Sequence, residues 1–263
     1  MGLLKSLFKS RTAPEEKLSD EDRRRMGERA RRQGETKEKP AGEMSEEEKL
    51  SYWGRLCEMN DLEERLRRLE ELAESGFDAA WLSMIEAYFA QSDARGMEPP
   101  FERLEYCARK AADAGLAEGH THLGMLCGSP LYGELDPEGA AREYLLAMEG
   151  GSESAARLLL DYWNREFHVE SYTPEENREL TAAFHESIRE AIRPEIERLS
   201  GGSGREALTA FGLLYFYGIY FEQSLDRAKE YFVKLNGMGS PLARRMLANP
   251  VFEDDDSDED DDE

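Results

Sequence analysis

"ALTAFGLLYFYGIYFEQSLDRAKEYFVKLNGMGSPLA", residues 207–243, decides how this chain folds. Its segment 210–221 is apolar and aromatic, and no charge interrupts it. That segment is too short to span a bilayer, which takes about 20 residues. The run "LLYFY" lacks the period-two alternation of a strand, whereas Ala207, Phe211 and Tyr215 share one stripe at helical spacing. The stretch therefore predicts a helix.

Two glycines refine this prediction. Gly212 lies inside the predicted helix, where glycine costs about 1 kcal/mol relative to alanine, so we expect a neighbouring helix to approach closely there. Gly218 is expected to end the helix. The residues that follow, "IYF" at 219–221, then form a loop that closes the end of the core.

The same pattern recurs along the chain, and internal repeats constrain a fold strongly. Gly239 is followed four positions later by a small residue, Ala243. The equivalent steps are Gly76 to Ala80, Gly115 to Gly119, Gly151 to Ala155 and, in a weaker copy, Ser203 to Ala207. The first residue of each step, here called the mark, begins the next copy of the pattern. Successive marks are 39, 36, 52 and 36 residues apart, which is a period with one long insertion.

Each repeat predicts two helices. Apolar residues lie three and four apart in the segment before each mark, and a second apolar segment follows it. Asp61, Asp136 and Ser224 stand at N-cap positions, Pro137 stands in a first turn, and the closing glycines stand at C′. One such helix pair cannot bury its apolar stripe alone, but stacked pairs can. We therefore expect an all-α chain, an α/α solenoid of about five units.

The stretch at 207–243 also carries a known family pattern, A-x3-L-G-x2-Y-x2-G and then K/R-A-x2-W/Y-Y/F-x-K-A-A-x2-G-x3-A. The agreeing positions are Ala207, Gly212, Tyr215, Gly218, Arg227, Ala228, Tyr231, Phe232, Lys234, Gly239 and Ala243, with Phe211 in place of a leucine. It resembles a Sel-one-like repeat, the α/α relative of the tetratricopeptide repeat. A second unit keeps Leu123, Gly124, Ala140, Tyr144, Ala147 and Gly151, with Cys127 in place of a tyrosine. A third keeps Tyr88, Lys110, Ala111, Ala112 and Gly115, with Ile85 in the glycine position.

The unit from Glu153 to Ser203 departs most from this pattern. It has Leu160 in the glycine position and an extended helix, "TPEENRELTAAFHESIREAIRPEIERLS", which we expect to be kinked or stopped near Pro194. How its helices pair stays open. The resemblance covers about residues 55–248, and it implies a right-handed superhelix that scaffolds protein complexes.

Charge divides the chain into three expected regions. They are a charged leader at 1–44, disordered or weakly helical; a helical-repeat domain at 45–252; and a disordered acidic tail at 253–263. Residues 1–40 hold twelve Lys or Arg and eight Asp or Glu, and the tail holds ten acids. The ends thus carry +4 and −10 of the total −23, which leaves −17 on residues 41–252.

This negative charge disfavours nucleic acid as a partner, because phosphate binding depends on clustered Lys and Arg. We expect a protein or peptide partner and favour a basic one. Cys57, Cys107 and Cys127 are widely spaced, so we expect apolar thiols in a reducing compartment rather than a disulfide framework or a zinc site. Some secreted relatives in the resembled family staple each repeat with a disulfide, and this chain lacks those cysteine pairs. The sequence has no apolar run of the length of a signal peptide or membrane span, so we expect a cytoplasmic protein.

No motif in the sequence indicates catalysis. His120 and His122 are two apart and would point to different sides of a helix, while His168 and His185 have no partner at ligand spacing. The segment "GGSG" at 201–204 is not followed by the lysine of a phosphate-binding loop. We therefore expect no enzyme activity, no cofactor and no metal site, and an enzyme is the third and least favoured function.

A concave groove is the expected binding surface. The helix that follows each mark is here called the leading helix, and the small residue at its start is numbered zero. The core stripe then falls near +4 and +8, and positions +2, +6 and +9 face elsewhere. Those positions are Leu82, Glu86, Phe89, Thr121, Met125, Gly128, Arg157, Asp161, Asn164, Thr209, Leu213 and Phe216. Their mixed character suits a peptide or a helix, and the alternative is that the apolar ones only pack against the next helix.

The termini allow a second function. "MGLLKSLFKSR" places leucines and a phenylalanine beside basic residues, so residues 1–12 would suit an anionic membrane surface, and Gly2 matches an N-myristoylation motif. The runner-up function is accordingly a peripheral membrane scaffold, and the alternative is a disordered leader. The acidic tail would act as a solubilising extension, as a ligand for basic partners or as the cover of a basic groove. Calcium binding is disfavoured there, and Ser257 is a possible phosphate acceptor.

Overall fold

The computed structural model describes residues 39–129 and 135–252. The chain divides into two compact units, residues 1–44 and 45–263. In the first unit the described part is short and contains one 3-10 turn, Ala41–Glu43. Most of the predicted leader and all of the predicted acidic tail lie outside the described residues. The predicted division into domains therefore stays a prediction.

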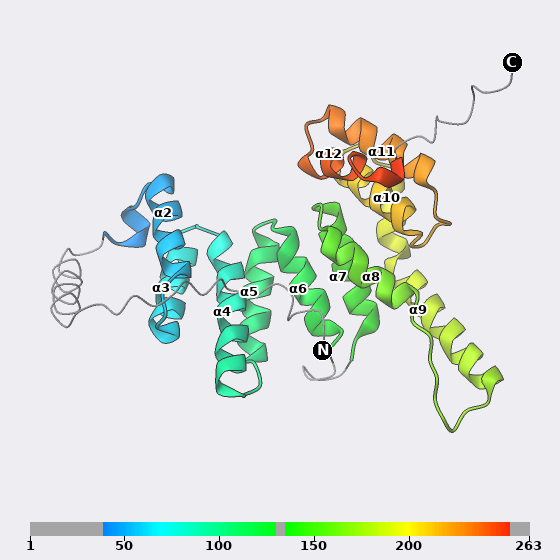
Figure 1. Cartoon of the computed structure of the whole chain (residues 1–263), viewed down its shortest axis with the longest axis horizontal. Helices are drawn as coiled ribbons and strands as arrows, with labels where there is room; N and C mark the ends of the chain where they lie inside the picture. The colour runs from blue at the N-terminus through cyan, green and yellow to red at the C-terminus, as the bar shows by residue number, and fades with distance from the viewer. Residues whose placement is uncertain (1–38, 130–134, 253–263) are drawn as a thin grey trace, which may run out of the picture. The chain divides into compact units, whose positions relative to one another are not determined.

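Every regular element in the described part of the chain is helical, as predicted, and that part has no strand (Figure 1). The helices are α2 (Glu46–Cys57), α3 (Leu62–Glu74), α4 (Ala79–Arg95), α5 (Phe101–Asp113), α6 (Ala117–Cys127), α7 (Pro137–Glu149), α8 (Glu153–Trp163), α9 (Pro174–Ser200), α10 (Arg205–Tyr217), α11 (Leu225–Gly237) and α12 (Pro241–Leu247), followed by a 3-10 turn at Pro250–Phe252. Among these helices, none combines the length and apolar character that crossing a bilayer requires.

Consecutive helices pack side by side from α2 to α8 and again from α10 to α12 (Figure 1). This is the predicted all-α arrangement of stacked helix pairs, an α/α solenoid. The predicted N-caps are also present: Asp61 accepts from Glu63 and Glu64, and Asp136 and Ser224 each accept one backbone N–H of their own first turns. The handedness of the superhelix stays a prediction from the family resemblance.

Four helices, α3, α5, α7 and α11, end in the same turn. Each turn has a glycine with a positive φ, namely Gly76 at 90°, Gly115 at 81°, Gly151 at 93° and Gly239 at 76°. The next residue donates its N–H to the carbonyl five positions back, in the pairs Phe77 to Leu72, Leu116 to Ala111, Ser152 to Ala147 and Ser240 to Leu235. This hydrogen bond defines a Schellman motif, which requires the left-handed residue that glycine supplies. The repeated glycine mark is therefore confirmed as a repeated structure.

The fifth mark, at Ser203, lacks this turn. Helix α9 ends instead at Ser200, and its C-cap Gly201 has a φ of −82°. The prediction of a weakened copy is correct only for Ala207, which is buried on α10 like the small residues of the other units.

The small residue after each mark allows two helix backbones to meet. Gly119 shows this most clearly, because a Cβ atom there would lie 2.3 Å from the backbone N of Ala112 and 2.7 Å from the backbone C of Ala111. Ala80, Ala155 and Ala243 are fully buried at the equivalent positions. Each leading helix thus begins against the last turn of the helix before it.

The glycine inside the leading helix accepts an aromatic ring from the next helix. A Cβ atom at Gly212 would lie 2.7 Å from the ring of Phe232 on α11, which confirms the predicted close approach. At Gly124 of α6 the same atom would lie 2.5 Å from the ring of Tyr144 on α7. Both rings are buried.

The unit of α4 and α5 fills this position differently. Ile85 stands at the position of Gly124 and Gly212, and Ala108 stands at the position of their aromatic partners, seven residues before the closing Gly115. Ile85 and Ala108 are both buried. The large side chain therefore comes from α4 in this unit, and the small one comes from α5.

The loop after α10 closes the end of the core as predicted. Gly218 ends the helix in the left-handed region, with φ at 70°. Ile219 is fully buried, and Phe221 stacks on Tyr215 with ring centroids 4.8 Å apart. Tyr220 adopts a φ of 65°, which is uncommon for a residue with a side chain.

Helix α9 runs unbroken through Pro194, so of the two predicted outcomes the stop is wrong, and the kink stays a prediction. Proline removes one backbone hydrogen bond, but buried residues on both sides of it hold the helix in the core. These are Ile188, Ile192, Ile196 and Leu199. Helix α9 packs mainly against α7 and only slightly against α8, which answers how this divergent unit pairs.

Candidate functional site

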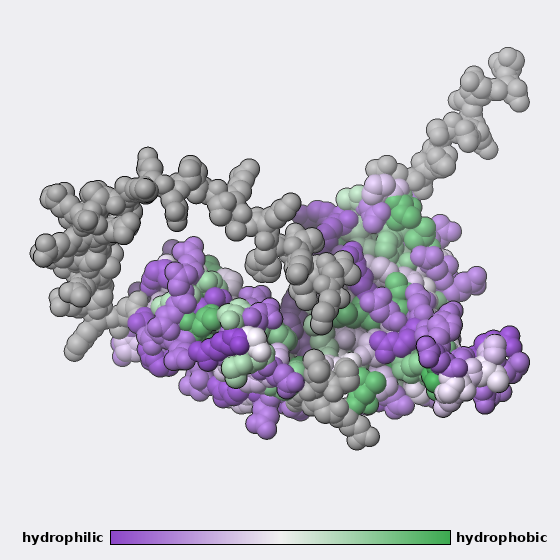
Figure 2. All heavy atoms as spheres, turned by 60° about the horizontal axis from the view of Figure 1, so that its bottom comes forward, coloured by the Kyte–Doolittle hydropathy of each residue, from purple (hydrophilic) through white to green (hydrophobic). Residues whose placement is uncertain are grey.

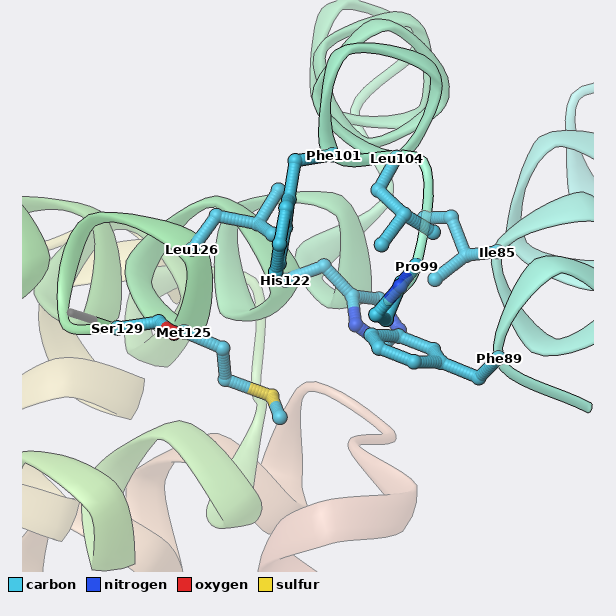
Figure 3. A pocket seen from close by; sticks show the side chains of 9 residues that line it. All are labelled: Ile85, Phe89, Pro99, Phe101, Leu104, His122, Met125, Leu126 and Ser129. Carbon is cyan, nitrogen blue, oxygen red and sulfur yellow. The ribbon is translucent and has the colours of Figure 1, made fainter. Parts of the chain in front are cut away.

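An apolar pocket of about 240 Å³ opens between α4, α5 and α6. Its lining consists of Ile85, Phe89, Pro99, Phe101, Leu104, His122, Met125, Leu126 and Ser129. Figure 3 shows side chains from the three helices directed toward the same space, with Met125 extended at its edge. Seven of the nine residues are apolar, which is the composition expected of a site that buries part of a ligand.

The pocket follows from the unequal lengths of the helices around it. Helix α4 has 17 residues and α6 has 11, so α4 continues past the turn where a shorter helix would end. Gly96 then reverses the chain in the left-handed region, with φ at 62°. The linker returns through Pro99 to Phe101 at the start of α5, and these two residues form one wall of the pocket.

His122 is one of two polar residues in the lining. Burial lowers its pKa below the ordinary value of a histidine, and the nearby charge of Glu118 opposes this only in part. His122 is therefore neutral at pH 7, and it adds no positive charge to the pocket.

Acidic residues are close in sequence to this apolar lining. Glu86, Glu98, Glu102 and Glu118 are exposed, and each is a sequence neighbour of a lining residue or lies one helical turn from it. Figure 2 shows small hydrophobic patches on a largely hydrophilic face of the molecule. The pocket thus combines an apolar interior with a negatively charged surround.

Two predicted groove residues, Phe89 and Met125, meet in this pocket. Met125 is 43% exposed, so a partner can reach it without any change in the fold. On α4, the helix of Phe89, Glu86 is exposed and Leu82 is half-buried. These positions stay candidates for a binding surface.

Three predicted groove residues are not on a surface. Leu213 is fully buried, and Thr209 and Thr121 are 4% and 7% exposed. Each threonine hydroxyl donates to a carbonyl of its own helix, Thr209 to Arg205 and Thr121 to Ala117. The prediction is wrong for these residues because α10 packs against α7, α8, α9 and α11, and α6 packs against both α5 and α7.

The remaining predicted positions lie on α8, on α10 and at the C-caps of α6 and α8. Arg157, Asp161 and Asn164 are exposed on α8. Phe216 is half-buried, and its ring lies 5.6 Å from that of Phe252 and 6.4 Å from that of Phe232. Gly128 contacts the Tyr162 side chain rather than an open groove. The structure therefore does not join these residues to Phe89 and Met125 in one surface.

The numbering of helix positions could not find the whole pocket. Pro99 belongs to a linker, and Phe101 begins α5, so neither shares the period of a leading helix. The one signal for this wall is the pair of prolines at 99–100, directly before an aromatic residue.

A second, wider cavity of about 530 Å³ lies between the segment after α8 and the first half of α9. Its polar side chains already hold that segment in place. Thr181 accepts from the N–H of Phe167, Asn177 accepts from the N–H of Val169, and His185 bonds the carbonyl of Arg165. These side chains are used to fix the backbone, so this cavity is the weaker candidate.

The described residues contain no group of His, Cys, Asp and Glu arranged to hold a metal ion. The three cysteines are free thiols. Burial raises the pKa of Cys107 to about 12 and also raises the pKa of Cys127. Neither thiol is activated as a nucleophile, because it is the thiolate that reacts.

Comparison with known proteins adds a similarity to a solved structure. No protein-family model matches the chain, and no curated protein matches it. Among solved structures, the chain is similar to a Sel1 repeat protein from Oxalobacter formigenes, with 18% sequence identity and a TM-score of 0.35. The match covers 71% of this chain and 49% of that one, so the chain spans about half the length of that protein. The assignment to the Sel-one-like repeats stays a prediction from the sequence pattern.

Proposed function

We propose that this protein is a non-enzymatic, cytoplasmic adaptor that binds a segment of a partner protein in the pocket between α4, α5 and α6. The observation that carries the proposal is the apolar pocket itself, open at Met125 and built into a scaffold of stacked helix pairs. Helical-repeat scaffolds provide extended surfaces of this kind for binding.

The size of the pocket suits a side chain from a partner. A cavity of about 150 Å³ holds one benzene molecule. The pocket, at about 240 Å³, has room for one large apolar side chain and part of its neighbour. Partners are commonly anchored in this way, by a few side chains buried in well-packed pockets. Met125 at the edge adds a flexible, polarizable surface that adapts to different anchors.

The proposal is tested by selecting random peptides on the full-length protein and measuring their affinity for variants. Met125→Lys places a charge at the edge of the pocket, and Met238→Lys is the matched control, because the two methionines are 43% and 44% exposed. We expect the selected peptides to bind wild type and Met238→Lys equally and to bind Met125→Lys at least ten-fold more weakly. Peptides that bind all three proteins equally would remove this pocket from consideration.

A further inference from the structure

The charges around the pocket are not neutralised. Among the described residues, Glu86, Glu98, Glu102 and Glu118 make no hydrogen bond or ion pair through their side chains. The basic side chains of the same helices are used elsewhere: Arg95 pairs with Glu63 at 2.9 Å, and Arg103 pairs with Glu70 at 2.6 Å. The rim of the pocket therefore presents net negative charge to a ligand.

Negative charge is concentrated on the helices from α2 to α9, which include those of the pocket. Residues 45–129, which form α2 to α6, hold eighteen Asp or Glu and nine Lys or Arg, a net charge of −9. Residues 205–252, which form α10 to α12, hold four acidic and six basic residues, a net charge of +2. Residues 135–204, which form α7 to α9, hold fifteen acidic and seven basic residues, a net charge of −8. A cationic ligand is therefore attracted toward α2 to α9, which include the helices of the pocket, and not toward α10 to α12.

The fold also restricts the form of the ligand. The described residues contain no strand, so an extended peptide has no sheet edge to pair with there. An amphipathic helix needs no sheet edge, because its backbone hydrogen bonds are internal. It also presents an apolar side chain together with the side chains three and four positions away on the same face. Those neighbours would reach the acidic residues around the pocket.

From the proposed function and this charge distribution, we infer that the partner segment is a basic amphipathic helix. One large apolar side chain enters the pocket beside Phe89 and Met125. Lysine or arginine side chains on either side of it pair with Glu86, Glu98, Glu102 and Glu118. The acidic rim makes a nucleic acid or an anionic membrane an unfavourable occupant of this same site.

The test uses three synthetic helical peptides and the full-length protein. The first peptide has leucine and phenylalanine on one face and lysine on the other, the second has glutamate in place of every lysine, and the third keeps lysine but has alanine in place of the apolar anchors. We expect only the first to bind tightly, and we expect its affinity to fall as salt is raised from about 0.05 M to about 0.5 M. Met125→Lys should weaken it at least ten-fold.

Neutralising two glutamates near the pocket tests how much charge contributes to peptide affinity, apart from the shape of the pocket. Glu98→Gln combined with Glu102→Gln should weaken the lysine peptide roughly five-fold, the size expected for two exposed charge pairs. Glu179→Gln combined with Glu197→Gln is the control, since both side chains are exposed elsewhere on α9. Circular dichroism melts establish that each variant is folded.

The outcomes distinguish the inference from the proposed function. Equal binding of the lysine and glutamate peptides, both lost in Met125→Lys, would overturn the inference and leave the pocket as the site. If the peptides selected at random are acidic or neutral and Met125→Lys weakens their binding, the inference would also be overturned and the pocket would remain the site. Lysine-peptide binding that is unaffected by Met125→Lys would overturn both.

Discussion

Replacing Gly119 with alanine should destabilise the protein, although the same replacement stabilises most helices. The added Cβ would lie 2.3 Å from the backbone N of Ala112, 2.7 Å from the backbone C of Ala111 and 2.9 Å from the carbonyl O of Ala108. These are backbone atoms, so the obstacle cannot rotate away, and α5 and α6 must separate. Overpacking costs about 1–3 kcal/mol, and the upper end applies here. Higher helix propensity returns at most about 1 kcal/mol, which leaves a net loss of about 2 kcal/mol.

The matched control is Gly54→Ala in α2. Gly54 is exposed, and a Cβ there would meet no atom within 4 Å, so only the gain in helix propensity of about 0.5–1 kcal/mol remains. Melting followed by circular dichroism should show Gly119→Ala about 4–8 °C below wild type. Gly54→Ala should melt slightly above wild type.

Gly212→Ala extends the same prediction to a position where the obstacle is a side chain. The Phe232 ring is fully buried, so the single variant should also be destabilised. Phe232→Leu removes the ring atoms that the new Cβ would meet, and in that background Gly212→Ala should cost less than it does alone. If Gly119→Ala melts at or above the temperature of wild type, or if Gly212 and Phe232 prove additive, the close contacts between helices would be refuted.

Three further predictions concern single residues and the N-terminus. Burial lowers the folded-state pKa of His122, so the stability that it contributes is present above about pH 6.5 and is lost as the pH falls below that value. In urea titrations, His122→Gln should therefore lose less stability than wild type between pH 7 and pH 5. Asp136→Ala removes the N-cap of α7 and should cost about 1 kcal/mol by the same assay, and an unchanged midpoint would contradict the cap. Residues 1–12, outside the described residues, are expected to support flotation with anionic liposomes, and equal flotation after their deletion would end the idea of a membrane scaffold.

The sequence predicts those features of the fold that depend on one residue type at one spacing. Glycine at C′ is required by backbone conformation, so the marks at Gly76 and Gly239 locate helix ends to within a residue. Gly212 predicts a close approach because glycine inside a helix is costly, so it is expected where a neighbouring group leaves no room for a Cβ atom. The identity of the filling side chain, Phe232, could not be read from spacing alone.

Burial on the outer side of a leading helix could not be predicted in the same way. Leu213 and Met125 occupy the same numbered position, yet the first is fully buried and the second is 43% exposed. The difference arises because α10 packs against α7, α8 and α9 as well as α11, whereas among the described elements α6 packs mainly against α5 and α7. Contacts between helices far apart in sequence carry no local signal.

The pocket borders a unit that departs from the repeat pattern, and one of the exchanged residues lines it. Where the pattern is kept, an aromatic ring such as Phe232 crosses from the second helix and fills the space at the glycine. In the unit of α4 and α5, Ala108 leaves no ring to cross, and Ile85 takes the space from the other side while also lining the pocket. Proteins break their own local rules most often at functional sites. Ile85, which replaces a glycine of the repeat pattern, therefore lies in the lining of the same pocket as Phe89 and Met125.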